Sequence, residues 1–421
     1  MFINKDNILT ADIDEIPIDS SWTIGDKKAS LMHNIHAYPA KFPPFITTKA
    51  LQYAENKGIR VDTIADLFCG CGTVAYEAMV NNRNFFGIDI NPIATLIAKT
   101  KCRKYDKSII IRYLKLIKEK FDIAENNFCN KFSENERIVY WFEEQQRTDL
   151  FKLLTAINSI VNIEEYKNFF YCAYSAILKS CSRWLTKSIK PQIDPNKKAK
   201  DVWRAFETHV KMMIKANEQC KINNDLNIDI STQSVLDLSI TYPFVDMLIT
   251  SPPYVTSYEY ADLHQLSTLC LGYSPDYKYF RKGSIGSLYN PQSIEENLNL
   301  INEIGSSVVK QMIPVDKRRA RSIAQYYIDI QKVVNKIRYL LRDRGVCFFV
   351  IGNTEYKGVK IDNARHLAQC LLDENFHDIE IKRRKISNKI LTPYRDKSGK
   401  FSSDKSCRKI YSEEFLIFAQ K

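Results

Sequence analysis

The chain has 421 residues, of which 45% are hydrophobic and 12% aromatic, a composition that is ordinary for a folded globular protein. It contains no run of 18 apolar residues that would predict a membrane span, and charged residues interrupt the N-terminal stretch MFINKDNILTADIDEIP, which excludes the apolar core of a signal peptide. The net charge of +12, from 61 basic and 49 acidic side chains, favours a polyanionic partner. We therefore expect a cytoplasmic protein without membrane contact.

The cysteines and histidines do not follow a metal-binding pattern. None of the eleven cysteines belongs to a CxxC pair, and the two nearest, Cys69 and Cys71, are separated by a single residue. His33 and His36 lie three residues apart with no further Cys or His close by. We predict reduced cysteines that pack as small hydrophobic side chains, structural histidines and no metal site.

Residues 62–98 have the pattern of a strand, a glycine-rich turn, a helix and a second strand. The apolar stretch DTIADLF is followed by CGCGT, by the helical VAYEAMVNN and by NFFGIDI. Such a βαβ unit builds a parallel sheet. Gly70 and Gly72 allow a sharp bend and a close approach of a ligand to the backbone, although a short GxG pattern is equally compatible with a purely structural turn.

An acidic residue ends the second of these strands. Asp89 lies 23 residues after Asp66, where a carboxylate can reach the ribose hydroxyls of a nucleoside cofactor. The turn lacks a Gly-Lys-Ser/Thr ending and is shorter than GxGxxG, so a nucleoside without a pyrophosphate, such as S-adenosylmethionine, fits better than NAD or ATP. The alternative is an exposed carboxylate at a strand end that binds no ligand.

Residues 105–225 change to helical periodicity and predict an all-helical insertion in the sheet. Its longest polar break, between Trp184 and Trp203, carries the lysines at 187, 190, 197, 198 and 200. This basic loop is suited to phosphate contacts, and an ordinary solvated linker remains the alternative.

Sheet patterns return at residues 231–239 and 244–250. The first contains Asp237, which we predict to be a third acid at a strand end. The second runs directly into TSPPY, residues 250–254, and must stop there because Pro252 and Pro253 have no backbone N–H for a sheet ladder. Since ligands of open parallel sheets bind at the carboxyl ends of the strands, these turns are expected to converge on one edge.

The remaining chain is helical and loop-rich from 255 to 340 and then returns to the sheet. A strand is predicted at GVCFFVIGN, residues 345–353, and HDIEIKRRKI and EEFLIFAQ are expected to pair as an antiparallel hairpin across the polar loop 388–411. One sheet with two insertions explains the length better than two independent folds.

The corner at residues 251–254 offers the groups that an exocyclic amine on a planar base needs. The Ser251 hydroxyl and a backbone carbonyl near Pro252 can accept hydrogen bonds from both amino hydrogens, which frees the nitrogen lone pair for attack on a methyl donor. Tyr254 offers a flat aromatic face for the base.

The combination of DLFCGCGT, GIDINP, VLDLS and TSPPY resembles the amino-methylating DNA methyltransferases, and HNIHAYPAKFPPFI is similar to their cofactor-side motif. SPPY is the form most typical of the cytosine-N4 branch, whereas adenine-N6 enzymes more often have Asp or Asn at the place of Ser251. The resemblance covers about 31–98, 231–260 and 340–421, and does not cover the helical insertion or most of 261–335.

The resemblance implies an α/β fold, the Rossmann-like fold of S-adenosylmethionine-dependent methyltransferases, with a mostly parallel sheet, an antiparallel C-terminal hairpin and a helical insertion. The implied catalytic residues are Ser251, Pro252, Pro253 and Tyr254, with Tyr254 stacking on a base flipped out of the duplex. The implied cofactor-binding residues are Lys41, Phe42, Pro43, Asp66, Phe68, Gly70, Gly72, Thr73, Asp89, Ile90 and Asp237.

The expected organisation follows the same motifs. Its parts are a cofactor-binding half at 1–104, the helical insertion at 105–225, the catalytic strand and loop at 226–260, a candidate target-recognition region at 261–335 and the C-terminal part of the sheet at 336–421. The target-recognition region is expected at 261–335, with 105–225 as the rival.

The implied function is methylation of cytosine N4 in double-stranded DNA, as the modification half of a restriction system whose cognate endonuclease acts separately. The same chemistry on adenine N6 or on RNA is the nearest alternative. A catalytically silent DNA-binding relative is the alternative from a different class. The recognition sequence and the oligomeric state have no signature in the sequence.

Overall fold

The computed structural model describes residues 1–24, 28–124, 135–188, 190–255, 260–288, 293–386, 394–395, 404, 408–409 and 412–421. Within them, one sheet of eight strands runs through the molecule in the order β1-β9-β12-β6-β5-β2-β3-β4. The strands are β1 (Phe2–Ile3), β2 (Thr63–Asp66), β3 (Asn84–Asp89), β4 (Ile228–Thr232), β5 (Val245–Thr250), β6 (Leu341–Ile351), β9 (His377–Lys385) and β12 (Glu413–Gln420). Short two-stranded ladders join β7 (Thr354–Tyr356) to β8 (Val359–Ile361) and β10 (Tyr394–Arg395) to β11 (Arg408–Lys409).

The five strands from β4 to β6 are parallel, and β12 is antiparallel to both β6 and β9. The predicted C-terminal hairpin is therefore confirmed: Glu414 pairs with Arg384 and Ile417 with Ile381. The arrangement is a Rossmann-like α/β fold, with a sheet that is parallel except at one end.

Successive residues of the central strands enter different cores, as the two-residue period of a strand requires. Ile64, Met247 and Ile249 belong to one hydrophobic core, whereas Ala65 and Leu248 belong to the other. The first core is covered by α1 (Pro44–Asn56), α2 (Thr73–Val80) and α3 (Pro92–Lys101), and the second by α13 (Glu303–Met312), α14 (Lys317–Leu340) and α15 (Asn363–Asp373). Both faces of the parallel strands are thus buried, which explains their continuous apolar runs.

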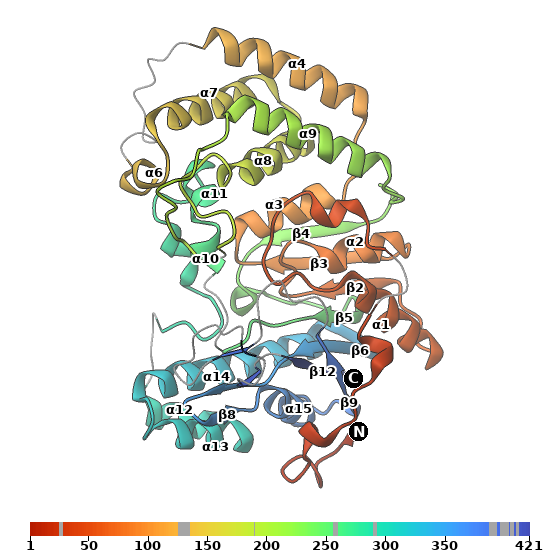
Figure 1. Cartoon of the computed structure of the whole chain (residues 1–421). Coiled ribbons are helices and arrows are strands. Elements are labelled where there is room, and N and C mark those ends of the chain that lie inside the picture. Colours follow the sequence, from red (N-terminus) through yellow and green to blue (C-terminus); the bar gives the residue numbers. More distant parts are fainter. Residues whose placement is uncertain are drawn as a thin grey trace.

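The helical insertion is confirmed as a block of helices between α3 and β4. It consists of α4 (Lys107–Ile123), α6 (Glu136–Trp141), α7 (Glu144–Ile160), α8 (Glu164–Leu178) and α9 (Val202–Glu218). Helix α8 packs against α3 and thereby joins the block to the sheet. In Figure 1 the block forms the upper part of the molecule, and the elements from α12 (Ile294–Leu300) onward form the lower part.

The segment 261–335 is divided between these two parts. Its first half, α10 (Tyr260–Leu263), α11 (Gln265–Cys270) and the 3₁₀ helix η5 (Tyr277–Arg281), contacts the helical block through α6 and α8. Its second half, α12 to α14, packs with α15 in the lower part (Figure 1). The three N-terminal 3₁₀ helices are η1 (Ile13–Glu15), η2 (Ser20–Trp22) and η3 (Leu31–Asn34).

The structure corrects two strand predictions. Residues 231–239 are not one strand, because β4 ends at Thr232 and is followed by the 3₁₀ helix η4 (Val235–Asp237). Strand β6 begins at residue 341 rather than 345, because it follows α14 without an intervening loop.

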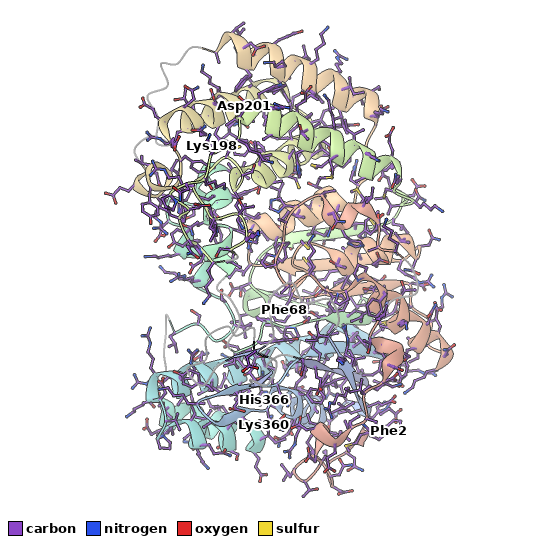
Figure 2. The ribbon with its side chains drawn as sticks, in the orientation of Figure 1. Phe2, Phe68, Lys198, Asp201, Lys360 and His366 are labelled. Atoms are coloured by element: carbon purple, nitrogen blue, oxygen red, sulfur yellow. The ribbon has the colours of Figure 1, made fainter. Side chains whose placement is uncertain are left out.

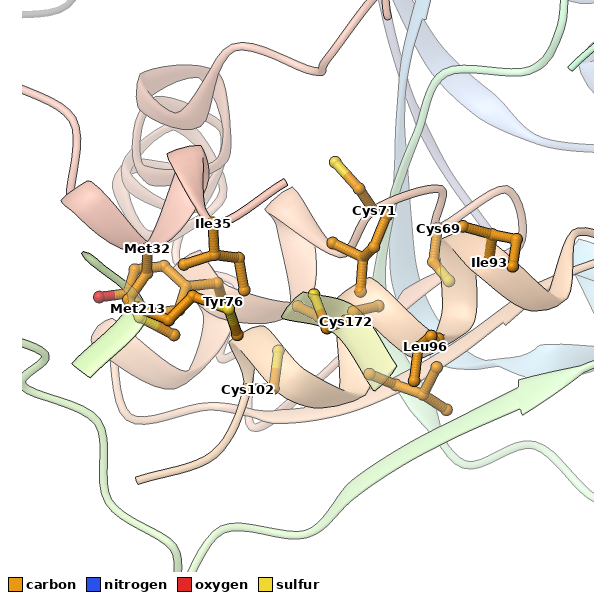
Figure 3. Packing of buried hydrophobic residues seen from close by; sticks show 14 of the residues in the cluster. Met32, Ile35, Cys69, Cys71, Tyr76, Ile93, Leu96, Cys102, Cys172 and Met213 are labelled. Atoms are coloured by element: carbon orange, nitrogen blue, oxygen red, sulfur yellow. The ribbon is translucent and has the colours of Figure 1, made fainter. Parts of the chain in front are cut away.

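The cysteines behave as packing residues. Nine of them lie within the described ranges, and all nine are buried and free. Figure 3 shows Cys69, Cys71, Cys102 and Cys172 among the aliphatic side chains of the first core. No group of three or more His, Cys, Asp and Glu side chains in the described part of the chain could hold a metal ion, and no described helix is long and apolar enough to cross a membrane.

Candidate active site at the carboxyl ends of the strands

The glycine turn leads from the end of β2 into α2. Gly70 and Gly72 adopt φ angles of +47° and +72°, which disfavour other residues. A Cβ atom at Gly72 would lie 2.6 Å from the Cβ of Ala98, so the glycine also lets α2 approach α3. Gly72 is the N-cap of α2, and Thr73 is its first residue, buried at the positive end of the helix dipole.

Asp89 closes this turn from the end of β3. Its Oδ2 accepts a hydrogen bond of 2.9 Å from the Gly70 N–H, and its Oδ1 accepts one of 2.8 Å from the Asn91 N–H. Among the described residues no ion pair involves Asp89, and burial raises the pKa of its carboxyl group to about 6. Each oxygen keeps a lone pair for a further donor. The carboxylate is therefore both fixed in direction and available to a neutral diol.

Asp66 connects the cofactor strand to the catalytic strand. The Thr250 hydroxyl donates a 2.6 Å hydrogen bond to Asp66 Oδ1, which also accepts from the Phe68 N–H at 3.0 Å. Burial raises the pKa of Asp66 to about 7. Because β2 and β5 are neighbours in the sheet, this contact fixes the glycine turn relative to the Ser251 corner. Phe68 lies in Figure 2 between the helical block, which carries Lys198, and the lower part, which carries His366.

The segment before α1 covers the glycine turn. Tyr38 lies against Gly70, whose Cβ position is 3.5 Å from the tyrosine hydroxyl oxygen. Lys41 Nζ donates to the His33 carbonyl at 2.5 Å, and burial lowers the pKa of this lysine. Phe42 and Pro43, which lead into α1, are half-buried. The structure thus brings 38–43 to the same edge as the turn.

The two histidines near this segment are structural, as predicted. His33 Nε2 lies 2.7 Å from Glu77 Oε1, and His36 bonds to Ser175 at 2.9 Å. A third histidine, His264 of the α10–α11 junction, stacks on Tyr38 and lies 2.7 Å from the Asn91 side chain. The helical block, the glycine turn and α11 are therefore held together by buried polar contacts.

Ile90 and Ser234, the N-cap of η4, lie next to the loop that follows η5. Gly283 approaches Ile90, with a Cβ position 3.4 Å from its Cδ1, and the Gly283 carbonyl accepts from Ser234 at 2.8 Å. Asp237 ends η4 and is exposed rather than placed at the end of a strand. It is near the predicted edge but has no fixed direction comparable to that of Asp89.

The corner at 251–254 follows β5 directly. Pro252 is buried, whereas Ser251, Pro253 and Tyr254 are half-buried. The Tyr254 hydroxyl donates to Glu414 Oε1 at 3.2 Å, and its ring lies against Gly352. Rigid prolines, a hydroxyl and an aromatic ring therefore meet at the same edge as the glycine turn.

The sequence did not reveal several residues of this site, namely Tyr38, Asn91, Thr250, His264, Gly352, Arg384 and Glu414. Tyr38, Asn91 and Thr250 stand inside HNIHAYPAKFPPFI, GIDINP and TSPPY, so their motifs were the available signal. The others reach the site from distant segments and carry no local pattern.

A comparison with protein families finds a similarity at this edge. Residues 5–100 match the family model of N6/N4 methyltransferases, described as DNA methylase. These residues contain the glycine turn, Asp89 and the covering segment 38–43.

Residues 5–100 are therefore similar to this family of DNA methylases.

Two relatives extend the similarity beyond these residues. The type II methyltransferase M.MvaI of Kocuria varians is 23% identical over 393 residues, which cover 85% of each protein. The type II methyltransferase M.MjaII of Methanocaldococcus jannaschii is 39% identical over 92 residues, which cover 21% of this chain and 17% of that protein.

Solved structures similar to this chain include two S-adenosylmethionine-dependent methyltransferases. An O-methyltransferase from Thermotoga maritima has a TM-score of 0.32 and 8% identity, with 93% of this chain and 71% of that chain covered. A methyltransferase from Methanosarcina mazei has a TM-score of 0.30 and 9% identity, with 92% and 98% covered.

S-adenosylmethionine is the cofactor that the similarity to DNA methylases implies, and the residues at the edge fit it. The fixed Asp89 carboxylate presents two acceptors to a ribose diol. The left-handed turn at Gly70 and Gly72 leaves backbone without Cβ atoms where a ligand passes, and Ile90 supplies an apolar side chain beside it.

Proposed function

We propose that this chain methylates the exocyclic N4 amine of cytosine in double-stranded DNA, as the modification enzyme of a type II restriction system. The single observation that carries the proposal is the corner Ser251–Tyr254, which follows β5 and is linked through Thr250 to Asp66 of the cofactor strand. The type II methyltransferase names of the two relatives support the role in DNA modification.

The cofactor is held by the turn and by its acids. Asp89 accepts the ribose hydroxyls, with Asp66, Phe68, Thr73 and the two glycines lining the turn. Ile90 and Asp237 lie on the adenine side, and Lys41, Phe42 and Pro43 near the methionine end. When bound, S-adenosylmethionine supplies an electrophilic methyl group on its sulfonium sulfur.

The protein's part in the transfer is to activate and orient the amine. The Ser251 hydroxyl and a carbonyl near Pro252 accept the two amino hydrogens, which directs the nitrogen lone pair out of conjugation with the ring. Pro252 and Pro253 have fixed φ angles, so these acceptors are already in place before the base arrives. Tyr254 provides the stacking face for the flipped base.

The first expected result concerns the product. DNA from a methylation-deficient host that expresses the chain should contain N4-methylcytosine when it is digested to nucleosides and examined by mass spectrometry. N6-methyladenine would instead move the activity to the adenine branch, which lacks the preference for Ser251. Unmodified DNA together with no measurable binding of S-adenosylmethionine would refute both, and modified RNA alone would change the substrate.

We further propose that the helical block and the segment 260–288 together contact the DNA. Buried Gln265 of α11 accepts hydrogen bonds from Arg137 at 2.9 Å and from Trp141 at 3.1 Å, both on α6. These contacts join the block to the chain that leaves the catalytic corner. A surface hollow between α6 and η5 is lined by residues of both, including Asn135, Arg137, Tyr277 and Lys278. This combines parts of 105–225 and 261–335, the two regions that the sequence offered.

The lysines of the basic loop differ in their exposure to solvent. Lys187, Lys190, Lys198 and Lys200 are exposed, whereas Lys197 donates to the carbonyls of Lys179 and Trp184 and so holds the loop in shape. A bridge between Trp184 and Ile193 fixes the loop further. The exposed ammonium groups of this loop are therefore held on a defined surface and are available to phosphates.

Replacing Lys187, Lys190 and Lys198 together by glutamine should weaken DNA binding and reduce the slope of log affinity against log salt by about 2 to 3, because each phosphate contact contributes about 0.9. Fluorescence anisotropy with a duplex at several salt concentrations measures the slope. The matched control replaces Arg112, Lys115 and Lys120, which are exposed on α4 at the outer end of the block (Figure 1). Equal losses in both triple variants would show that net charge, not this loop, binds DNA.

A further inference from the structure

A buried ion pair lies behind the catalytic corner. Arg384 near the end of β9 is 1% exposed, and Glu414 near the start of β12 is its cross-strand partner. Arg384 Nη1 lies 3.3 Å from Glu414 Oε2. The Arg384 guanidinium also lies 5.7 Å from the ring centre of Phe45, in the first turn of α1. The carboxylate is thereby held in one direction by a side chain that has almost no freedom.

The other oxygen of the same carboxylate contacts Tyr254. Glu414 Oε1 accepts the hydroxyl of Tyr254 at 3.2 Å, although the two residues are 160 positions apart. Burial, and then the negative charge of Glu414, raise the pKa of this phenol well above its usual range. The hydroxyl therefore stays protonated and keeps its role as donor throughout the physiological range.

The ring of Tyr254 is held from another side by Gly352, just after β6. A Cβ atom at this glycine would lie 3.0 Å from Tyr254 Cε2 and 3.4 Å from its Cζ, so a larger residue would push the ring away. The Gly352 carbonyl in turn accepts from buried Asn363 at 2.9 Å. Hydroxyl and ring are thus both fixed, which leaves one orientation for the aromatic plane.

We propose that Glu414, oriented by Arg384, is a positioning residue that fixes the Tyr254 ring in the plane on which the target base stacks. The inference rests on the proposed function, because it assumes that Tyr254 meets the base. A buried ion pair contributes little net stability after the cost of desolvation, whereas a fixed carboxylate can determine where the ring lies. Tyr254 touches the substrate, and Glu414 acts only through Tyr254.

Glu414→Ala should lower kcat for DNA methylation about tenfold, the size expected for one hydrogen bond to a charged group, with unchanged affinity for S-adenosylmethionine. Glu414→Gln should restore most of the rate, because the amide oxygen still accepts the phenol. Tyr254→Phe should lose a similar factor, and combining it with Glu414→Ala should cost nothing further. Independent, multiplying losses would overturn the proposal, as would an undiminished rate in Glu414→Ala.

The matched control is Glu413→Gln. Glu413 forms its own strand-to-strand ion pair, with Arg383 Nε at 2.8 Å, and it is the neighbour of Glu414 in β12. The methylation rate of Glu413→Gln should equal that of the wild type. A loss of rate as large as that of Glu414→Ala would assign the effect to this end of the sheet as a whole. If Glu414→Ala fails to fold because Arg384 is left unpaired, the double variant Glu414→Leu with Arg384→Met removes both charges and asks the same question.

A readout independent of methylation separates this inference from the proposed function. In protein with ring-labelled tyrosine, the NMR signal of Tyr254 is identified by its loss in Tyr254→Phe, and it should shift in Glu414→Ala but not in Glu413→Gln. A shift without any DNA methylation by the wild type would refute the proposed function and leave the contact intact. Methylation without a shift would refute the positioning role alone.

Discussion

Asp89→Asn is expected to bind S-adenosylmethionine about ten- to a hundredfold more weakly than the wild type. The carboxylate accepts the N–H groups of Gly70 and Asn91 and has one lone pair left on each oxygen for the ribose hydroxyls. The amide of asparagine has one acceptor oxygen fewer, and its NH₂ group faces backbone N–H and ribose O–H groups that are themselves donors. A hydrogen bond to a charged group is worth about 1.5–3 kcal/mol. Isothermal titration calorimetry gives the two dissociation constants.

The control for Asp89→Asn is Asp62→Asn. Asp62 precedes β2, at the opposite edge of the sheet, and pairs with exposed Arg60. Cofactor affinity should be unchanged in this variant. An equal loss in both variants, or no loss in Asp89→Asn with an unaltered melting temperature, would contradict the assignment of Asp89 to the ribose.

The pH dependence of cofactor affinity tests the role of Asp89 in a second way. Burial raises the pKa of Asp89 from 3.8 to about 6, so the group becomes protonated below that pH and loses acceptors. Affinity should therefore fall about tenfold between pH 7 and pH 5, and Asp89→Asn should lack this dependence. The free energy of unfolding of the unliganded protein depends on pH in the opposite direction. Because the folded pKa lies above the unfolded one, the contribution of Asp89 decreases as pH rises from about 4 to 6.

The cofactor half of the site could be predicted because its signals are local. The strand, the GxG turn and the strand-end acid lie within 28 residues, and periodicity alone places Gly70 and Asp89 on one edge of a parallel sheet. The antiparallel end was also predictable, because β9 alternates apolar and polar residues at its start, β12 contains a continuous apolar run, and a polar loop joins them. Topology limits how such elements can be arranged.

Asp237 shows where local reasoning fails. A single 3₁₀ turn has no period that distinguishes it from the end of a strand, so Val235 and Leu238, both buried, read as strand residues. The start of β6 after α14 was predicted wrongly for a related reason. Helix and strand follow each other at Leu340 and Leu341, and no turn residue marks the change.

The contacts that complete the site join residues that are far apart in the chain. Thr250 and Asp66 are 184 positions apart, and Asn91 and His264 are 173 apart. A single sequence does not indicate which side chains are in contact when they are so far apart in the chain. The sequence therefore predicts which motifs share the edge, and the structure is needed to show which residues orient them.

Tyr254→Ala is expected to lose most methyl transfer while retaining affinity for S-adenosylmethionine. Stacking of a base on an aromatic side chain is worth about 1–3 kcal/mol, which corresponds to about ten- to a hundredfold in rate. Cofactor binding should not change, because the Tyr254 phenol contacts Glu414 and Gly352 rather than the glycine turn. Single-turnover methylation of a duplex measures the rate, and calorimetry measures cofactor affinity.

Two further variants separate stacking from misfolding. Tyr254→Phe keeps the ring, so it should be faster than Tyr254→Ala and slower than the wild type, the difference from the wild type being the hydrogen bond to Glu414. Tyr242→Ala removes an exposed tyrosine that precedes the same strand and should leave the rate unchanged. If cofactor affinity fell as much as the rate in Tyr254→Ala, the ring would belong to the donor site and not to the base. Only a rate loss with intact cofactor binding is consistent with a ring held for the flipped base.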